Sequence, residues 1–403
     1  MREWVKSPVV VVVNRVCKIG CNCVMVVIMI HIGLNAHLLS GRAGYRSAGI
    51  HGYIYHTLAH LRAASPEDWR YTVMMGANNP MAFDGLTLRR TRWDTEPPLR
   101  RILWEQAAQP WQLGDFDLYH ALVFVSPLLL TKPSVVTVYD LSFLHYPQML
   151  SASRRLYLRL FTALSCRRAR RVIAISRSTA HDLTTSLSIP ADKIDVAAPG
   201  YDTTVYQPLL AEQVAAFKHK HGLPDRFWLF LGTLEPRKNL VTLIEAYAAL
   251  PASERLPLIV AGGKGWLYQD IFAAVERYNL VKELQFPGYL PVEDLPLWYN
   301  SAEVFIYPSL FEGFGLPVLE AMACGTPVMV SDGSSLPEVA GEAGLRLPPH
   351  DIPAWTHGLR RAFADANWRS DARHQGLVEA GRYRWANTAR ATVDSYRKAL
   401  GLS

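Results

Sequence analysis

Two glutamates, Glu312 and Glu320, are separated by seven residues in the segment with the clearest capacity for chemistry. The apolar run before them predicts a strand that ends at Pro308, then a glycine-containing loop, then a helix with Pro317 in its first turn. Glu312 is expected in the loop and Glu320 about one turn inside the helix. A carboxylate can accept two hydroxyl donors, so both side chains suit a sugar or ribose ligand.

The loop between the two glutamates favours an anionic ligand as well. Its glycines let the backbone approach a ligand closely, and the free N–H groups at the start of the helix attract phosphate. The ordinary alternative is a capping glutamate followed by a surface glutamate. For an isolated pair of glutamates, that structural interpretation would be preferred over a functional one. The prediction therefore rests on the whole string of residues 307–327.

The elements that must position these residues alternate along the chain. Short β-rich apolar runs and helix-length segments follow one another, which predicts parallel sheets with crossover helices, the doubly wound α/β class. The predicted strands are Val26–Asn35, Tyr71–Met75, Leu118–Val125, Val135–Tyr139, Arg171–Ile175, Trp228–Leu231, Leu258–Ala261, Leu284–Phe286, Val304–Tyr307 and Val328–Val330. These strands are too many for one sheet of this connectivity.

Two Rossmann-like domains are therefore expected, one over residues 29–205 and one over 206–385, because turn residues near Pro199 to Pro208 end the first series. A cleft at the carboxyl ends of the two facing sheets would hold the ligand. Residues 1–28 are expected to be an N-terminal extension, with a mis-assigned start as the simplest account.

Composition narrows the class of partner. The chain has 403 residues and a formal net charge of +7, which favours an anionic partner: a nucleotide, a phospholipid surface or a nucleic acid. No basic stripe interleaved with aromatic residues is evident, so nucleic acid ranks lowest. Cys166 and Cys324 are expected to be core thiols of a reducing compartment. Cys17, Cys21 and Cys23 lack a fourth ligand at plausible spacing, so a metal site there is not expected.

Two segments bear on membranes. Residues 8–30 are Val-rich but contain Arg15 and Lys18, and each charge at mid-bilayer costs about 2.5–3.5 kcal/mol, so no transmembrane helix is expected. The arginine-rich segment from Ser151 to Arg171 predicts a basic amphipathic helix that could lie on an anionic membrane. The solvated outer face of a Rossmann helix is the slightly favoured alternative, and the two are compatible.

Residues 304–340 closely resemble the Glu-x7-Glu signature of retaining glycosyltransferases of family four, which have the GT-B fold of two Rossmann-like domains. Residues 231–240 resemble the family's pyrophosphate-binding turn, and residues 288–290 resemble the turn whose backbone faces the base. The resemblance covers roughly residues 29–403. It implies that a last helix, residues 386–403, packs back on the first domain.

The resemblance implies a site for a nucleotide-sugar donor. Lys238, supported by Arg237, would hold the diphosphate and neutralise its charge as it leaves. Glu320 would bond the ribose hydroxyls, and Glu312 would hold the donor sugar. The further donor-side residues are Gly313, Phe314, Gly315, Leu316, Gly232, Thr233, Tyr289 and Leu290. Since fixed cations and a helix N-terminus can stabilise the leaving group, we expect no metal and no cofactor beyond the nucleotide-sugar co-substrate.

The resemblance places the acceptor in the first domain. Gly49 lies in the glycine loop Gly41–Gly52, before a helix expected from Tyr53. His120 is expected at a strand end facing the cleft, in a catalytic or sugar-contacting role, or equally as a satisfied structural histidine. Asp140 is a further acceptor-side residue.

Three positions depart from the family pattern. Gly52, Tyr139 and Thr233 stand where relatives often have Arg, His and Arg. The donor motif is intact, but these departures weaken any inference about the acceptor and about a full phosphate clamp. An Asp-x-Asp string at Asp115 to Asp117 resembles a metal motif of another glycosyltransferase fold, but a pattern of three residues is too common to weigh.

The expected function is retaining, metal-independent transfer of a hexose, with mannose favoured, from a nucleotide sugar to a glycan or lipid-linked acceptor in polysaccharide biosynthesis. We expect a cytoplasmic protein, with peripheral contact to the inner face of the plasma membrane as a further expectation. The alternative is a non-catalytic GT-B scaffold or nucleotide-sugar-binding protein, supported by the three departures. Donor binding without turnover would distinguish it.

Overall fold

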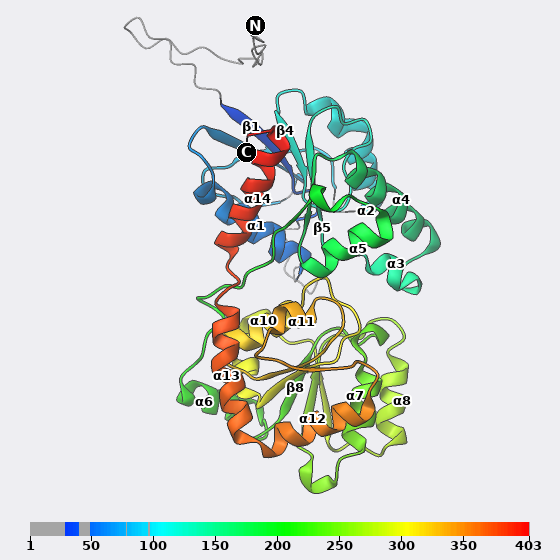
Figure 1. Ribbon diagram of the computed structural model, residues 1–403, viewed down its shortest axis with the longest axis vertical. Coiled ribbons are helices and arrows are strands. Elements are labelled where there is room, and N and C mark those ends of the chain that lie inside the picture. Colours follow the sequence, from blue (N-terminus) through cyan, green and yellow to red (C-terminus); the bar gives the residue numbers. More distant parts are fainter. Residues whose placement is uncertain (1–28, 40–48, 78, 96, 403) are drawn as a thin grey trace, which may run out of the picture.

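Two parallel β-sheets, each covered by helices, make up the fold in the computed structural model (Figure 1). The structure describes residues 29–39, 49–77, 79–95 and 97–402. The expected extension of residues 1–28 lies outside the described residues, and so do Cys17, Cys21, Cys23 and the start of the strand predicted from Val26.

Sheet A of the first domain has the strand order β3-β2-β1-β4-β5-β6-β7, and all its pairs are parallel. Its strands are β1 (Ile30–Asn35), β2 (Trp69–Met75), β3 (Thr87–Arg90), β4 (Leu118–Ala121), β5 (Ser134–Val138), β6 (Arg171–Ala174) and β7 (Ile194–Val196). The strand order reverses beside β1, which places a switch point between β1 and β4.

Sheet B of the second domain has the order β10-β9-β8-β11-β12-β13, again with parallel pairs throughout. Its strands are β8 (Trp228–Leu231), β9 (Leu258–Ala261), β10 (Leu284–Gly288), β11 (Val304–Tyr307), β12 (Val328–Ser331) and β13 (Leu345–Leu347). Every residue of β11 is buried, as expected for a central strand with helices on both faces. The switch point lies between β8 and β11, where open α/β sheets bind ligands at the carboxyl ends of their strands.

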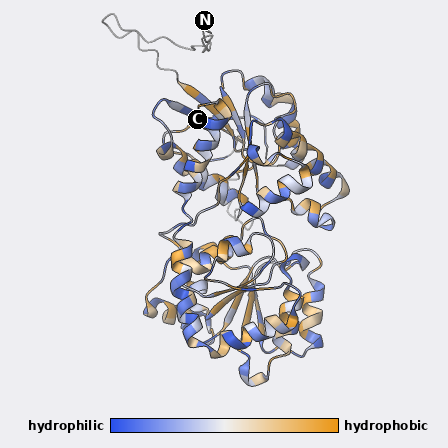
Figure 2. Ribbon diagram, in the orientation of Figure 1, coloured by the Kyte–Doolittle hydropathy of each residue, from blue (hydrophilic) through white to orange (hydrophobic). Residues whose placement is uncertain are grey.

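The helices that cover the sheets follow the strands in alternation. They are α1 (Ile50–Ala64), α2 (Pro98–Leu103), α3 (Ser142–His145), α4 (Ala152–Arg168), α5 (Arg177–Leu187), α6 (Ala211–His221), α7 (Leu240–Ala248), α8 (Gln269–Arg277), α9 (Leu295–Ser301), α10 (Leu316–Ala323), α11 (Leu336–Ala340), α12 (Ile352–Ala364), α13 (Ala366–Ala380) and α14 (Trp385–Leu400). Figure 2 shows hydrophobic strands inside and more hydrophilic helices around them. The expected fold class, two Rossmann-like parallel-sheet domains, is confirmed.

Three strands were not predicted from the sequence: β3, β7 and β13. Each lies at an edge of its sheet and pairs on one side only. None of the three is fully buried along its length, so none carries the continuous apolar run that identified the central strands.

Several predicted boundaries were wrong. The helix predicted from Ser151 to Arg171 ends at Arg168, because Arg171 already belongs to β6. The strand predicted over Leu118–Val125 ends at Ala121, because the chain turns away and Phe124 adopts a positive φ of 43°. The first helix begins at Ile50 rather than Tyr53, with Gly49 as its N-cap at a φ of 70°. Gly52 therefore belongs to α1, and most of the predicted glycine loop lies outside the described residues.

The chain crosses from the second domain back to the first at its end. Helix α14 packs against α1, as Figure 1 shows, and also contacts the strands β4, β5, β6 and β7. Tyr53 of α1 contacts Trp385 of α14 edge to face, with the ring centroids 5.8 Å apart. Cys166 and Cys324 are free and buried, as predicted. Among the described residues, none of the helices is long and apolar enough to cross a membrane.

Candidate functional site

The candidate site forms where two neighbouring strands of sheet B end. After β8 the chain passes Gly232 and enters a 3-10 turn, Pro236–Lys238, and after β11 it passes Pro308 into the loop before α10. Strands β8 and β11 are paired, so the turn and the loop are adjacent at the switch point. Lys238 and Glu312 are brought together although 74 positions separate them in the sequence.

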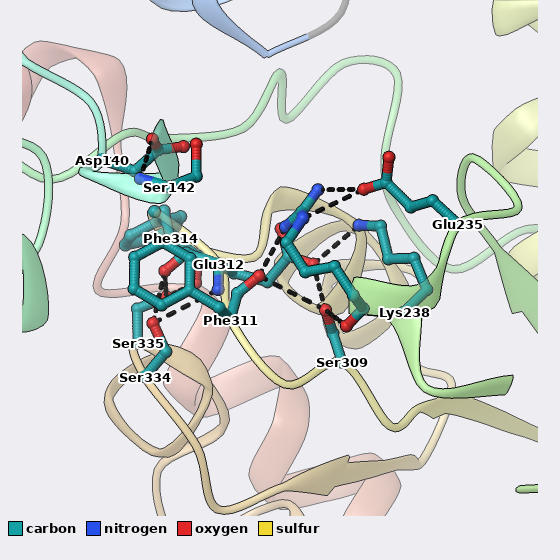
Figure 3. A network of polar contacts seen from close by, with 12 residues as sticks. Asp140, Ser142, Glu235, Lys238, Ser309, Phe311, Glu312, Phe314, Ser334 and Ser335 are labelled. Carbon is teal, nitrogen blue, oxygen red and sulfur yellow. Dashed lines mark hydrogen bonds and ion pairs between the residues drawn. The ribbon is translucent and has the colours of Figure 1, made fainter. Parts of the chain in front are cut away.

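Glu312 lies between two cations. Its Oε1 accepts a hydrogen bond from Lys238 Nζ at 2.6 Å (Figure 3). Its Oε2 lies 3.0 Å from Nη1 of Arg237. Ser309 donates a further bond to Oε1 at 2.5 Å. Burial alone raises the pKa of Glu312, but Arg237 and Lys238 outweigh it and hold the pKa at about 2. Lys238 Nζ also donates to the Tyr307 hydroxyl at 2.6 Å.

Glu235 orients Arg237 from the other side. Its Oε1 accepts from Nε of Arg237 at 3.0 Å and from Nη2 at 2.7 Å, and its Oε2 accepts from Trp266 Nε1 at 3.1 Å. Burial opposes the charge of Arg237, but the carboxylates of Glu312 and Glu235 raise its pKa. Glu235 was not predicted as part of the site, because an acid two positions before an arginine is too common a pattern to identify it.

Two serines hold the backbone of the loop that was expected to contact the donor. Ser334 Oγ donates to the carbonyl of Glu312 at 2.6 Å, and Ser335 Oγ donates to the carbonyl of Phe314 at 2.7 Å (Figure 3). Gly315, at a φ of 108°, is the N-cap of α10, a backbone conformation that favours glycine. Leu316 is then the first residue of the helix, so the predicted residues 313–316 form the turn into α10.

Glu320 lies within α10 and faces two tyrosines. The Tyr299 hydroxyl donates to Oε2 of Glu320 at 3.0 Å, and the Tyr206 hydroxyl lies close enough to favour the ionised form of the same carboxyl group. Burial raises the pKa of Glu320 to about 7, and these hydroxyls oppose the shift only in part. Neither tyrosine was predicted as part of the site, because no sequence spacing connects α9 and the interdomain linker with α10.

The other expected donor-side residues follow strands of the same sheet. Gly232 and Thr233 come directly after β8, and Thr233 is exposed. Tyr289 and Leu290 come directly after β10, two strands from β8 in the sheet order; Tyr289 is exposed and Leu290 is buried. The structure places all four at the carboxyl edge of sheet B. Gly232 lies beside the Lys238 side chain, because a Cβ added to Gly232 would lie 3.5 Å from Lys238 Cε. Within the 312–316 turn, Glu312 is the residue that pairs with both cations.

The first domain meets this turn directly. A Cβ atom added to Gly313 would lie 2.5 Å from the carbonyl oxygen of Tyr139 and 3.1 Å from Cβ of Asp140. Thr179 Oγ1 donates to the carbonyls of Tyr139 at 3.0 Å and Gly313 at 3.3 Å. Asp140 therefore lies against the donor-side turn, whereas the Tyr139 side chain points into the core and donates to the Leu122 carbonyl. Gly49 is exposed at the start of α1.

His120 does not face the cleft as one interpretation expected. Its side chain is 1% exposed, Nδ1 lies 2.6 Å from the Tyr396 hydroxyl, and Nε2 lies 2.8 Å from Thr137 Oγ1. Burial lowers the pKa of His120 to about 3, so the ring is neutral near pH 7. The geometry corresponds to the alternative interpretation, a satisfied structural histidine, because helix α14 covers the strand end.

A cavity of about 1130 Å³ lies between the domains beside the loop. Its lining includes Phe311, Arg177, Glu338 and Tyr383. Glu338 Oε2 accepts from the backbone N–H of Arg177 at 2.8 Å, which joins α11 to the start of α5 across the domain boundary. The cavity therefore borders the residue before Glu312, while Lys238 and Glu320 lie outside its lining.

The Asp-x-Asp string is engaged within the protein. Asp115 forms an ion pair with Arg89 at 2.7 Å, and Asp117 Oδ2 accepts from the backbone N–H of His31 at 2.8 Å. Within the described part of the chain, no cluster of three or more His, Cys, Asp or Glu side chains could hold a metal ion.

Comparison with known proteins gives two family matches and several relatives. Residues 47–205 match the model described as Glycosyltransferase Family 4, and residues 212–378 match Glycosyl transferases group 1. The chain is 35% identical over 294 residues to the O-antigen chain mannosyltransferase B of Escherichia coli, covering 72% of this chain and 77% of that one. It is 36% identical over 241 residues to the serotype-specific mannosyltransferase WbdA of Escherichia coli, covering 58% of this chain but 29% of that longer one.

Solved structures share the fold. A sucrose-phosphate synthase from Thermosynechococcus elongatus superposes with a TM-score of 0.74 at 22% identity, covering 93% of this chain and all of that one (100%). The Anabaena protein HepE, solved in complex with UDP and glucose, superposes with a TM-score of 0.70 at 18% identity, covering 91% and 99%. These likenesses agree with the expected GT-B arrangement of two Rossmann-like domains.

Proposed function

The chain belongs to the glycosyltransferases in which a family 4 domain precedes a group 1 domain, and we propose that it transfers a hexose, with mannose favoured, from a nucleotide sugar to a glycan or lipid-linked acceptor. We further propose that the reaction retains the anomeric configuration and needs no metal ion. The observation that carries the donor assignment is the pair of cations, Lys238 and Arg237, held at the β8–β11 switch point.

The cation pair supports a diphosphate leaving group. When the bond between the anomeric carbon and the diphosphate oxygen breaks, that oxygen takes both bonding electrons and becomes negatively charged. Lys238 and Arg237 are fixed beforehand by Glu235, Tyr307 and Glu312, so they stabilise this charge without reorganising. The turn that leads from Glu312 into α10 adds backbone N–H groups at the start of a helix.

The positions of the two glutamates favour a nucleotide-sugar donor whose sugar and ribose lie on either side of the diphosphate. Glu312 is ionised over the whole neutral range and lies in the loop, where it can accept from hydroxyls of the donor sugar. Glu320 lies about one turn inside α10, where it can accept hydrogen bonds from the ribose hydroxyls. The acceptor hydroxyl would enter from the first domain, where Asp140 lies against Gly313.

The preference for mannose rests on the relatives. Two Escherichia coli proteins, each at least 35% identical to this chain over the aligned residues, are named mannosyltransferases, and one of them is named for the O-antigen chain. We therefore propose a growing surface polysaccharide or its lipid-linked precursor as the acceptor class.

Donor binding is tested with the purified full chain by thermal unfolding in EDTA, with GDP-mannose, UDP-glucose, UDP-N-acetylglucosamine and dTDP-rhamnose in parallel. A ligand at 100 times its dissociation constant stabilises the folded state by about 2.7 kcal/mol. We expect GDP-mannose to stabilise the protein, and this effect to vanish in Lys238→Ala and Glu320→Ala. A well-folded protein that none of the four donors stabilises would contradict the proposal, and a need for added metal would contradict the metal-independent reaction.

Turnover separates the enzyme from a donor-binding scaffold. We expect release of GDP from GDP-mannose to accelerate when a mannose-containing oligosaccharide is present. If a donor stabilises the protein but no tested acceptor leads to transfer of its sugar, the result would favour a non-catalytic donor-binding scaffold.

A further inference from the structure

Three leucines are exposed along one face of α4. Leu156, Leu160 and Leu164 are 58%, 49% and 41% exposed. They recur every fourth residue, which places them above one another on the helix surface, and Arg168 continues the same row. Isolated exposed leucines are common on protein surfaces, but a row of three on one helix face indicates contact with an apolar partner.

Helix α4 carries only one sign of charge. Its 17 residues include five arginines and no Asp or Glu: Arg154, Arg155, Arg159, Arg167 and Arg168. Arg155 and Arg167 donate hydrogen bonds to backbone carbonyls of Pro147 and Leu187. None of the five forms an ion pair with a described residue, so the positive charge of the helix is not neutralised within the described fold.

A basic cavity of about 220 Å³ opens at the carboxyl end of this row. Its cationic side chains are Lys132, Arg168 and Arg170, and no carboxylate lines it. Its lining also includes Ser126, Thr131 and Ser134, whose hydroxyl groups can donate hydrogen bonds. Three cations and three hydroxyls around so small a space suit a phosphate group.

The apolar surface extends beyond α4. Leu99 and Leu103 of α2 and Leu129, in the turn that lines the cavity, are each more than 60% exposed. This turn contacts both α4 and the segment after α2. The backbone N–H of Ser126 donates to Ser165 Oγ of α4, and the backbone N–H of Leu128 donates to Gln106 Oε1, just after α2. Figure 1 shows α2 and α4 on the same side of the first domain.

We propose that the leucine row of α4, the neighbouring leucines and the basic cavity form one docking face for an anionic phospholipid bilayer, with a lipid phosphate held in the cavity. A bilayer surface presents phosphates beside acyl chains, which matches cations and leucines on one face. A protein partner would match the leucines equally but would need a dense cluster of carboxylates to match this charge. The inference goes beyond the proposed reaction, since vesicle binding needs no nucleotide sugar.

The test is co-sedimentation of the full chain with vesicles of phosphatidylglycerol and phosphatidylcholine, compared with vesicles of phosphatidylcholine alone. We expect binding to the anionic vesicles that weakens as salt is added, and at least tenfold weaker binding to the neutral ones. The triple variant Leu156→Ser, Leu160→Ser, Leu164→Ser should lose at least tenfold in affinity. Each cation near an anionic surface contributes about fivefold, so Lys132→Gln with Arg170→Gln should lose about 25-fold.

A matched control changes three apolar residues of the second domain that are, as a set, more exposed than the α4 leucines: Leu210→Ser, Val281→Ser and Val378→Ser. This control should bind vesicles as the unaltered chain does, and all variants should keep the same unfolding temperature. Full vesicle binding by the α4 triple variant, or equal binding to neutral vesicles, would overturn the docking face. Binding that is unchanged in the Lys132/Arg170 variant would overturn the phosphate site. A dimer that dissociates only in the α4 variant, without vesicle binding, would assign the face to a second copy instead.

Discussion

Lys238 Nζ donates to Glu312 Oε1 at 2.6 Å, and the two side chains are only 7% and 12% exposed. They come from the ends of neighbouring strands, so one contact joins the β8 turn to the signature loop. The pair holds a cation and a carboxylate at the place where the proposed diphosphate and sugar would meet.

Lys238→Ala should reduce both stability and donor binding. Removing one partner of a buried ion pair leaves the other charge uncompensated, which costs about 3–5 kcal/mol, and Arg237 offsets part of that here. We expect a loss of about 2 kcal/mol in the free energy of unfolding in urea and no stabilisation by a donor. The double variant Lys238→Ala, Glu312→Ala should recover part of the stability but no activity. A stable and active single variant would show that the pair has no role in the site.

Glu320 should make donor binding depend on pH near neutrality. Its pKa in the free protein is about 7, raised by burial, and the ionised form is the better acceptor for ribose hydroxyls. Affinity should therefore rise as the pH increases through 7 and level off above it, by at most tenfold per pH unit below the pKa. Isothermal titration calorimetry between pH 5.5 and 8.5 measures this.

Variants of Glu320 and of its partner Tyr299 test whether Glu320 causes this pH dependence of donor affinity. Glu320→Gln cannot ionise, so its weaker affinity should not change with pH. Tyr299→Phe removes a hydrogen bond that lowers the pKa of Glu320, so the rise in affinity should move to higher pH. An identical pH profile in Glu320→Gln would mean that another group is responsible.

Gly313→Ala should hold the domains apart. Its new Cβ would lie 2.5 Å from the Tyr139 carbonyl oxygen, closer than atoms can approach, while neither domain's own core is touched. We expect an almost unchanged unfolding temperature, a fall in kcat of at least tenfold and a larger radius of gyration in X-ray scattering. Gly114→Ala is the matched control, since a Cβ there meets no atom within 4 Å. Normal turnover in Gly313→Ala would show that this contact is not needed for the reaction.

His120→Ala should act on stability rather than on chemistry. It leaves the buried hydroxyls of Tyr396 and Thr137 without their partner, at a cost of about 2 kcal/mol. We expect a lower urea midpoint, with kcat per folded molecule within twofold of normal. The opposite pattern, unchanged stability with a large fall in kcat, would restore the catalytic interpretation of this histidine.

Segments that are continuous in the sequence were predicted well. The strand, loop and helix around Glu312 and Glu320 were predicted from an apolar run and from proline and glycine positions, and the structure has β11, the loop and α10 in that order. The central strands of both sheets were predicted because their buried runs are uninterrupted. Three of the four edge strands, β3, β7 and β13, were not predicted, because a strand that pairs on one side needs no continuous apolar run.

The environment of each site residue was decided only by the tertiary structure. His120 was open to two interpretations until α14 brought Tyr396, 276 positions away, onto its ring. Likewise Tyr299 and Tyr206 meet Glu320 only in the folded chain, where burial raises the pKa of Glu320 and the two tyrosines oppose that rise. A local pattern encodes which elements form and in what order, whereas burial, hydrogen-bond partners and charge state depend on residues that only packing brings together.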